Sequence, residues 1–296
     1  MTIIEAIIQG IIQGLTEFLP VSSSGHLSVF QYLTGRSGEE AAVFSIVLHL
    51  GTLIAVVLAF WPTLWGLLLE LFSALGELFR GRLDLRPRSP RRKMLYLLLA
   101  SVLPLFSVVL LKGFFRRVAA DNDIVVEGVC FLITALFLFL ADHALPGRKK
   151  AASMTYKDAL IIGCAQAVAP LPGISRSGAT LTTGLLLGLD KSYAVSFSFI
   201  MGIPAVLGAV LLDVKDVFSQ EFSIGWGALA AGLVCAVLFG LLAIGLVRWL
   251  VASNRLSLFA AYTFVLGLLV LFVGVYDQFS GHAIQQWVSG ALFGAP

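Results

Sequence analysis

Glu17-Phe-Leu-Pro-Val-Ser-Ser-Ser-Gly-His26 and Pro172-Gly-Ile-Ser-Arg-Ser-Gly-Ala-Thr180 are two polar, glycine-bearing strings in a chain that is otherwise mostly apolar. A shift of 153 residues, from 22 to 175, places Ser-X-Ser-Gly of the first string on Ser-X-Ser-Gly of the second. The same shift also aligns Gly10 with Gly163 and Gln13 with Gln166. The chain is therefore predicted to be a duplication, with repeat 1 at about 1–147 and repeat 2 at about 148–296.

The composition predicts a helical membrane protein. Hydrophobic residues make up 58% of the 296 residues, charged residues 12%, and the mean hydropathy is +0.95. Soluble domains carry about twice that share of charge. Six apolar runs approach the roughly 20 residues that cross a bilayer core of about 30 Å. They are 41–60, 94–111, 124–141, 193–212, 225–247 and 257–276.

The basic residues predict how these spans are oriented, because Lys and Arg accumulate on the cytoplasmic side. The loop 80–93 holds seven of them, so we place it inside. Alternation of the six spans then puts fourteen basic residues inside and five outside, with both termini outside. The loop 213–221, with Asp213, Asp216 and Glu221, falls on the outer side.

The two special strings interrupt helices that would otherwise span the membrane. Segments 3–34 and 158–190 are expected to enter and return on the same side, so each half also has three full spans. An odd number of spans gives the halves opposite orientations, which is typical of inverted repeats. The expected fold is an all-α polytopic protein with one membrane domain, 1–296, whose two re-entrant hairpins meet near mid-membrane.

Each interruption has the features of an anion site. Proline ends the first helix of each pair, at Pro20 and at Pro170, and serines then cap the second helix. The unpaired amides and positive dipole of a helix N-terminus attract phosphate. Arg176 adds a planar fork of donors that matches phosphate, although a structural ion pair with Glu17 would also explain a buried arginine.

The two strings differ in their acid–base groups. The first carries Gln13, Glu17 and His26 where the second has Gln166, Pro170 and Ala179. This asymmetry favours a hydrolase over a symmetric carrier. Glu17 and Gln13 supply hard oxygen atoms that suit Mg²⁺ or Ca²⁺, and His26 can move a proton. His49 lies in an apolar run and is expected to be a core residue.

The strings Gln13–His26 and Pro172–Thr180 resemble those of the bacitracin-resistance family of undecaprenyl-diphosphate phosphatases. The family pattern begins with Glu or Gln, and this chain has Gln13, which leaves Glu17 as the main anionic ligand. The resemblance implies removal of the terminal phosphate of undecaprenyl diphosphate, which recycles the carrier lipid of cell-wall synthesis and confers bacitracin resistance. It also implies a divalent cation, a bacterial plasma (inner) membrane location and a site open to the outer, periplasmic face.

On this basis each polar residue receives a role. Ser23 is expected to attack the terminal phosphorus while His26 shuttles the proton; the alternative gives the attack to His26. Glu17, with Gln13, would position the cation. The phosphate-binding residues would be Arg176, Ser22, Ser24, Gly173, Ser175, Ser177 and Thr180.

Other functions fit the sequence less well. A lipid-phosphate carrier or flippase is the main alternative, because inverted repeats with broken helices are typical of transporters. An intramembrane serine protease would not need Arg176. The expected partners are the prenyl diphosphate lipid and membrane lipids. No nucleic acid is expected, and a homodimer is left open.

Overall fold

The computed structural model describes the chain except for residues 36–38, 83, 85, 120–122, 219–223 and 294–296. Within the described residues the fold is helical, with one isolated bridge between Lys149 and Leu189. The elements are α1 Ile3–Phe18, α2 Ser23–Thr34, α3 Glu39–Ala59, α4 Trp61–Phe79, α5 Pro90–Val102, η1 Leu103–Leu105, α6 Phe106–Leu110, α7 Lys112–Ala119, α8 Val125–Asp142, α9 Tyr156–Ala167, α10 Arg176–Leu186, α11 Lys191–Phe218, α12 Trp226–Ala252, α13 Leu256–Phe279 and α14 Ala283–Phe293.

The helices confirm a multi-pass membrane protein. Six stretches in the described chain are long and apolar enough to cross a bilayer: Trp61–Phe79, Pro90–Leu110, Val125–Asp142, Lys191–Leu211, Trp226–Ala252 and Leu256–Phe279. The last five coincide with runs predicted from the sequence. The remaining predicted run, 41–60, is helix α3, whose apolar part is 43–59. Helix α4 was not among the runs predicted from the sequence; Pro62 occupies its first turn, where its missing amide costs nothing.

Helices α1 and α9 begin with the same local geometry. Thr2 caps α1 and forms a reciprocal capping box with Glu5, and Thr155 does the same for α9 with Asp158. These pairs differ by the 153 residues that relate the two strings. Both helices then stop early, α1 after 16 residues and α9 after 12. Each is too short to span a bilayer core by itself.

Close helix contacts are made through glycine. Helix α1 packs along α12, and α8 along α13, over the most extensive interfaces of the described fold. At Gly10, an added Cβ would lie 2.5 Å from the carbonyl oxygen of Gly232. Small residues let membrane helices approach this closely. The hydrophobic effect does not drive helices together within lipid, so van der Waals packing has to hold them. The α1–α12 contact therefore fixes the position of the helix that carries Glu17.

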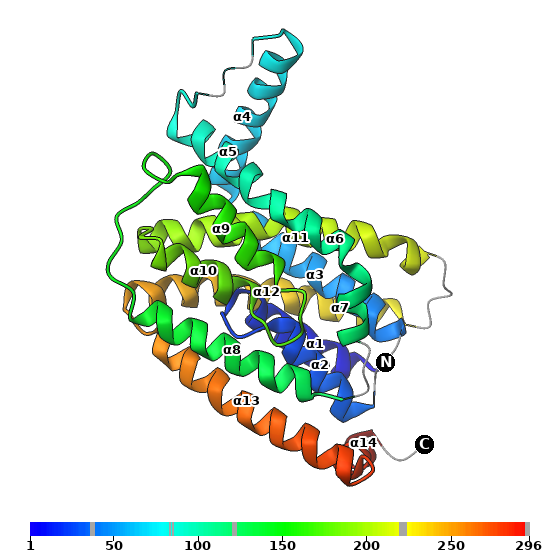
Figure 1. The fold of residues 1–296 in the computed structure, drawn as a ribbon. Coiled ribbons are helices and arrows are strands. Elements are labelled where there is room, and N and C mark those ends of the chain that lie inside the picture. The colour runs from blue at the N-terminus through cyan, green and yellow to red at the C-terminus, as the bar shows by residue number, and fades with distance from the viewer. Residues whose placement is uncertain (36–38, 83, 85, 120–122, 219–223, 294–296) are drawn as a thin grey trace.

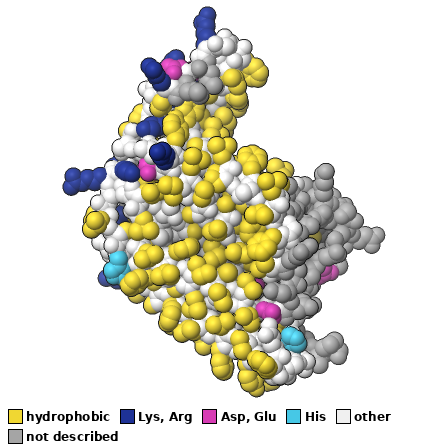
Figure 2. Space-filling model, viewed as in Figure 1, with side chains coloured by type: hydrophobic (Ala, Val, Ile, Leu, Met, Phe, Trp, Pro, Cys, Tyr) yellow, Lys and Arg dark blue, Asp and Glu magenta, His cyan; other side chains and the backbone are white. Residues whose placement is uncertain are grey.

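The surface separates apolar and basic regions. Figure 2 shows hydrophobic side chains over most of the visible face, and Lys and Arg gathered at the end that carries α4 and α5. This end carries the loop 80–93, and its cytoplasmic orientation stays a prediction. The charged residues expected on the outer side include Arg36, Asp213, Lys215, Asp216 and Glu221, which lie outside the described side chains.

Gly10→Ala is expected to destabilise the protein in detergent by about 1–3 kcal/mol, because the new methyl group overlaps the backbone of α12. The matched control is Gly245→Ala, since nothing lies within 4 Å of its added Cβ. Thermal unfolding of the purified full chain compares the two variants. Equal melting temperatures would contradict the close α1–α12 contact.

Candidate active site

The two helix breaks have nearly the same construction. Helix α1 ends at Phe18, and α2 begins at Ser23 with Ser22 as its N-cap, whose Oγ accepts a hydrogen bond from the amide of Gly25 at 3.3 Å. Helix α10 begins at Arg176, and the N-cap Ser175 accepts from the amide of Gly178 at 3.0 Å. The remaining first-turn amides of α2 and α10 have no partner within their helix and can bind a ligand.

Unusual backbone conformations occur at both breaks. Ser22 has φ of 70°, in a region that residues with a Cβ rarely adopt. Gly173 has φ of 92°, and an added Cβ there would lie 2.6 Å from the carbonyl oxygen of Glu127. Such conformations persist only where surrounding contacts hold them, and they concentrate at functional sites. Gly173 is thus needed for the shape of the second break.

The two breaks meet in space. An added Cβ at Gly25 would be 2.8 Å from the amide nitrogen of Gly173, so the two loops are in direct contact. The hydroxyl of Ser177 donates to the carbonyl oxygen of Leu19 at 3.3 Å. The structure therefore brings together polar groups that are about 150 residues apart in the chain, as the repeat predicted.

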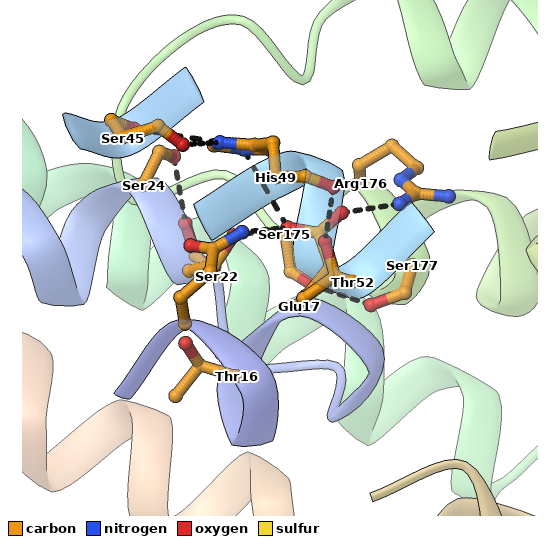
Figure 3. A network of polar contacts seen from close by, with 12 residues as sticks. Thr16, Glu17, Ser22, Ser24, Ser45, His49, Thr52, Ser175, Arg176 and Ser177 are labelled. Carbon is orange, nitrogen blue, oxygen red and sulfur yellow. Dashed lines mark hydrogen bonds and ion pairs between the residues drawn. The ribbon is translucent and has the colours of Figure 1, made fainter. Parts of the chain in front are cut away.

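Glu17 is the centre of the polar network (Figure 3). Its Oε1 accepts a hydrogen bond from Arg176 Nη2 at 2.5 Å. Its Oε2 accepts from Ser23 Oγ at 2.7 Å and from Gln13 Nε2 at 3.0 Å. Glu17 is only 8% exposed and Arg176 only 15%. Burial of a charge is tolerated when it is paired and hydrogen-bonded, and here both conditions are met.

The position of Arg176 depends on Gly202 in α11. A Cβ added at Gly202 would overlap the guanidinium group of Arg176. The glycine therefore leaves space for the arginine side chain to turn toward Glu17. Thr52 of α3 lies with Glu17, Arg176 and Gly202 around a second, smaller hollow.

A cavity of about 420 Å³ opens beside this network. Its polar end is lined by Thr16, Glu17, Ser22, Ser23, Ser24, His49, Gln166, Ser175 and Arg176. Its other walls are apolar and come from Val102 to Val109, around η1 and α6, and from Pro204 to Ala209 of α11. The arrangement suits a ligand with a small anionic head and a long apolar tail.

The two histidines are placed differently from the sequence expectation. His49 lines the cavity, with Nε2 at 3.8 Å from Glu17 Oε2, and its Nδ1 lies 2.7 Å from the carbonyl oxygen of Ser45. It is not the core residue that was expected.

His26 does not appear among the cavity-lining residues of the described chain. Its ring nitrogens lie 2.6 Å from the Ser22 carbonyl oxygen and 2.8 Å from the Tyr262 hydroxyl.

Other predicted site residues support the loops instead of lining the cavity. Thr180 is buried, and its hydroxyl lies 2.6 Å from the hydroxyl of Ser198. Ser177 Oγ lies 3.2 Å from Ser175 Oγ and also bonds to Leu19. Gly173 accepts a hydrogen bond at its carbonyl oxygen from Thr134 Oγ1 at 2.8 Å. These contacts stabilise the second break from behind.

Gln166 is a cavity residue that the sequence analysis did not assign to the site. Both its amide oxygen and its amide nitrogen are buried without a hydrogen-bond partner among the described residues. Unsatisfied buried amides are costly, so this amide is available to bind a ligand or a water molecule. The signal was present in the alignment of Gln166 with Gln13, which has an unpartnered, buried Oε1.

The oxygen donors present fit a divalent cation only in part. Glu17 and the free Oε1 of Gln13 are hard ligands of the kind that Mg²⁺ and Ca²⁺ prefer. No group of three or more His, Cys, Asp or Glu side chains suitable for a metal is found in the described chain. A cation here would therefore need further oxygen atoms from the diphosphate of a substrate.

Comparison with known proteins agrees with this geometry. The family model described as "Bacitracin resistance protein BacA" matches residues 6–269. An undecaprenyl-diphosphatase of Christiangramia forsetii is 40% identical over 90% of this chain and 97% of its own length. An undecaprenyl-diphosphatase of Methanosphaera stadtmanae is 35% identical over 93% of this chain and 99% of its own length. The "Undecaprenyl-diphosphatase 3" of Bacillus cereus is 37% identical over 94% of this chain and 100% of its own length. The chain belongs to the bacitracin-resistance (BacA) family.

Proposed function

We propose that this protein hydrolyses undecaprenyl diphosphate to undecaprenyl phosphate and inorganic phosphate. The relatives carry the name of this activity over nearly the whole chain. The observation that carries the proposal here is the hydrogen-bonded set Arg176–Glu17–Ser23 at the polar end of a cavity with apolar walls. A bacitracin-resistance role is consistent with the family.

Substrate binding divides between the two ends of the cavity. The N-termini of α2 and α10 and the guanidinium of Arg176 would hold the phosphates, since each supplies N–H donors to anionic oxygens. The unpartnered amide of Gln166 would bind one further phosphate oxygen or the attacking water. The apolar wall around Phe106 and Val206 would contact the first isoprene units.

Ser23 is the proposed nucleophile. Its hydroxyl already donates to Glu17 Oε2 at 2.7 Å, so the carboxylate can take the proton as the oxygen attacks. The new bond joins Ser23 Oγ to the terminal phosphorus, and the bond from that phosphorus to the bridging oxygen breaks. The prenyl monophosphate departs with the bridging oxygen. Water then attacks the phosphoserine, which releases inorganic phosphate and restores the hydroxyl.

His49 is better placed than His26 to exchange protons with Glu17, because its Nε2 lies 3.8 Å from the carboxylate and its ring lines the cavity. We assign His49 to proton transfer with the leaving phosphate or the attacking water. His26 becomes a positioning residue, since its Nδ1 contacts the strained Ser22 and its ring lies edge-on to Phe131.

A divalent cation remains part of the proposal. Glu17 and Gln13 Oε1 would hold it together with diphosphate oxygens, and when bound it would neutralise charge that develops on the phosphoryl group. The protein groups would still provide orientation, because phosphoryl transfer depends mainly on positioning and charge stabilisation.

We further propose that the two broken helix pairs are re-entrant and oppositely oriented in the plasma membrane, with the cavity open to the outer face. The matched capping boxes, matched N-caps and the contact between the two breaks support this topology. The same symmetry would also suit a lipid-phosphate carrier. Proteoliposomes separate the two: release of phosphate without movement of the lipid across the bilayer favours the enzyme.

Ser23→Ala is expected to lower phosphate release from a long-chain prenyl diphosphate by at least about a thousandfold, because the nucleophile is lost. Arg176→Lys is expected to lower it by about a hundredfold, because one charge remains but the planar fork is lost. Arg148→Lys, at an exposed position, serves as the control. Near-normal release by Ser23→Ala, or a trapped phosphate on His26, would contradict the assignment.

His49→Gln is expected to lower kcat for phosphate release more than His26→Gln does, because His49 is assigned to proton transfer and His26 only to positioning. The measurement is kcat of both purified variants with a long-chain prenyl diphosphate. A larger loss with His26→Gln would restore the proton shuttle to His26.

Treatment with a chelator is expected to reduce phosphate release by the purified full chain, and added Mg²⁺ or Ca²⁺ should restore it. Gln13→Ala should raise the cation concentration needed for half-maximal rate, because one oxygen ligand is lost. The comparison variant is Gln31→Ala, which lies on α2 and outside the cavity lining of the described chain. An unchanged rate in excess chelator would exclude the cation.

A further inference from the structure

Helix α4 and the basic segment after it have no part in the proposed chemistry, yet their surface is organised. The outward face of α4 is formed by Trp61, Trp65, Leu68, Phe72, Leu75 and Phe79, which are between 38% and 87% exposed. These positions recur every three or four residues and so share one side of the helix. A face of this kind needs an apolar environment.

The opposite side of α4 faces the protein, where buried Leu67 and Ala74 lie beside a polar row that contacts α5. Arg92 is buried against it, with Nε at 2.8 Å from Glu70 Oε2 and Nη2 at 3.2 Å from Glu77 Oε1. Ser73 accepts a third hydrogen bond from Arg92 at 2.9 Å. The acidic residues of α4 are thus paired on its protein-facing side, whereas its outward face is apolar.

The junction with α3 decides where α4 lies. Helix α3 has 21 residues with an apolar part at 43–59, and we take it as the span expected at 41–60, because at about 1.5 Å per residue the whole helix is long enough for a core of about 30 Å. Phe60 alone separates it from α4, which is too short a link for an antiparallel pair of spans. Arg248 holds this corner, with its guanidinium carbon 4.4 Å from the centre of the Phe60 ring. Helix α4 therefore begins at the membrane face where α3 ends.

Figure 1 shows α4 leaving the bundle at a steep angle to α8, α11 and α13. Trp61 and Trp65 stack at its start with ring centroids 5.8 Å apart, and tryptophan is enriched at the membrane–water interface. Exposed Arg80, Arg82, Arg86, Arg88 and Arg91 follow its end. A helix with an apolar face and adjoining basic residues lies in the interface and attracts anionic lipids.

We propose that α4, although apolar enough to span, lies in the interface of the basic membrane face, and that the arginines following it bind anionic phospholipid headgroups. The apolar face enters the boundary between headgroups and acyl chains, while the arginines contact phosphate groups beside it. The proposal is independent of the reaction, because none of these residues lines the cavity of the described chain.

Spin labels test the depth of α4. The background is a full chain in which Cys130, Cys164 and Cys235 are replaced by alanine. In it, cysteine replaces Trp65, Phe72 or Phe79, one at a time, to carry the label. Each labelled chain is placed in bilayer discs of phosphatidylcholine and phosphatidylglycerol. All three labels should be accessible to oxygen, shielded from a water-soluble nickel chelate, and similarly shallow, at about 5–10 Å. A spanning helix would separate the end labels by about 21 Å in depth. The proposal would be overturned by such a difference in depth or by free access of the nickel chelate to the labels. Shielding of the labels from both reagents by a protein partner would also overturn it.

Charge variants test the lipid class. Native mass spectrometry compares binding of phosphatidylglycerol and phosphatidylcholine to the detergent-purified chain. The first triple variant combines Arg80→Gln, Arg82→Gln and Arg86→Gln. It should lower the preference for phosphatidylglycerol over phosphatidylcholine by about fivefold per removed charge at low salt. The matched control combines Arg148→Gln, Lys150→Gln and Lys157→Gln, and retained phosphate release checks folding. An equal loss in both triple variants, or none in the first, would overturn the role of the arginines.

Discussion

The buried ion pair between Glu17 and Arg176 is the interaction on which the site depends. It joins the end of α1 to the start of α10, and so it fixes the two helix breaks relative to one another. Two charges inside a membrane protein are stable only when each satisfies the other and further hydrogen bonds complete the set. Ser23 and Gln13 provide those bonds to Glu17, which also makes Ser23 available to a base. The structural and the catalytic interpretations of Arg176 are therefore compatible.

Tight helix packing makes this pair possible. Gly202 leaves the space that the guanidinium fills, and Gly10 lets α1 approach α12 closely enough to hold Glu17 in place. In a membrane, contact between backbones supplies the packing energy that apolar burial supplies in water. The exposed apolar surface contacts lipid instead of other helices. On α4 this surface extends beyond the bundle to the membrane interface.

Much of the site could be predicted, because the two strings are local and repeated. Helix breaks near Pro20 and Pro170 and serine caps at Ser22 and Ser175 follow from local rules for proline and serine. An ion pair with Glu17 was one of the two explanations that the sequence offered for a buried Arg176. The roles of the histidines could not be read in the same way. His49 looked like a core residue because its neighbours in the chain are apolar, whereas the side of α3 that faces the cavity is known only once α3 is packed. His26 looked catalytic because it adjoins the serines, yet its ring turns toward Tyr262.

The sequence by itself determined the membrane class and the position of most spans, and it predicted the repeat and an anion-binding pocket. These properties depend on composition, on residue spacing and on local rules for proline, serine and helix ends. Only the tertiary structure decided which polar groups line the cavity, that Gln166 has no hydrogen-bond partner among the described residues, and that α4 leaves the bundle directly after α3. The reason is physical: the direction of a side chain and the partner it meets depend on how helices distant in the chain pack together.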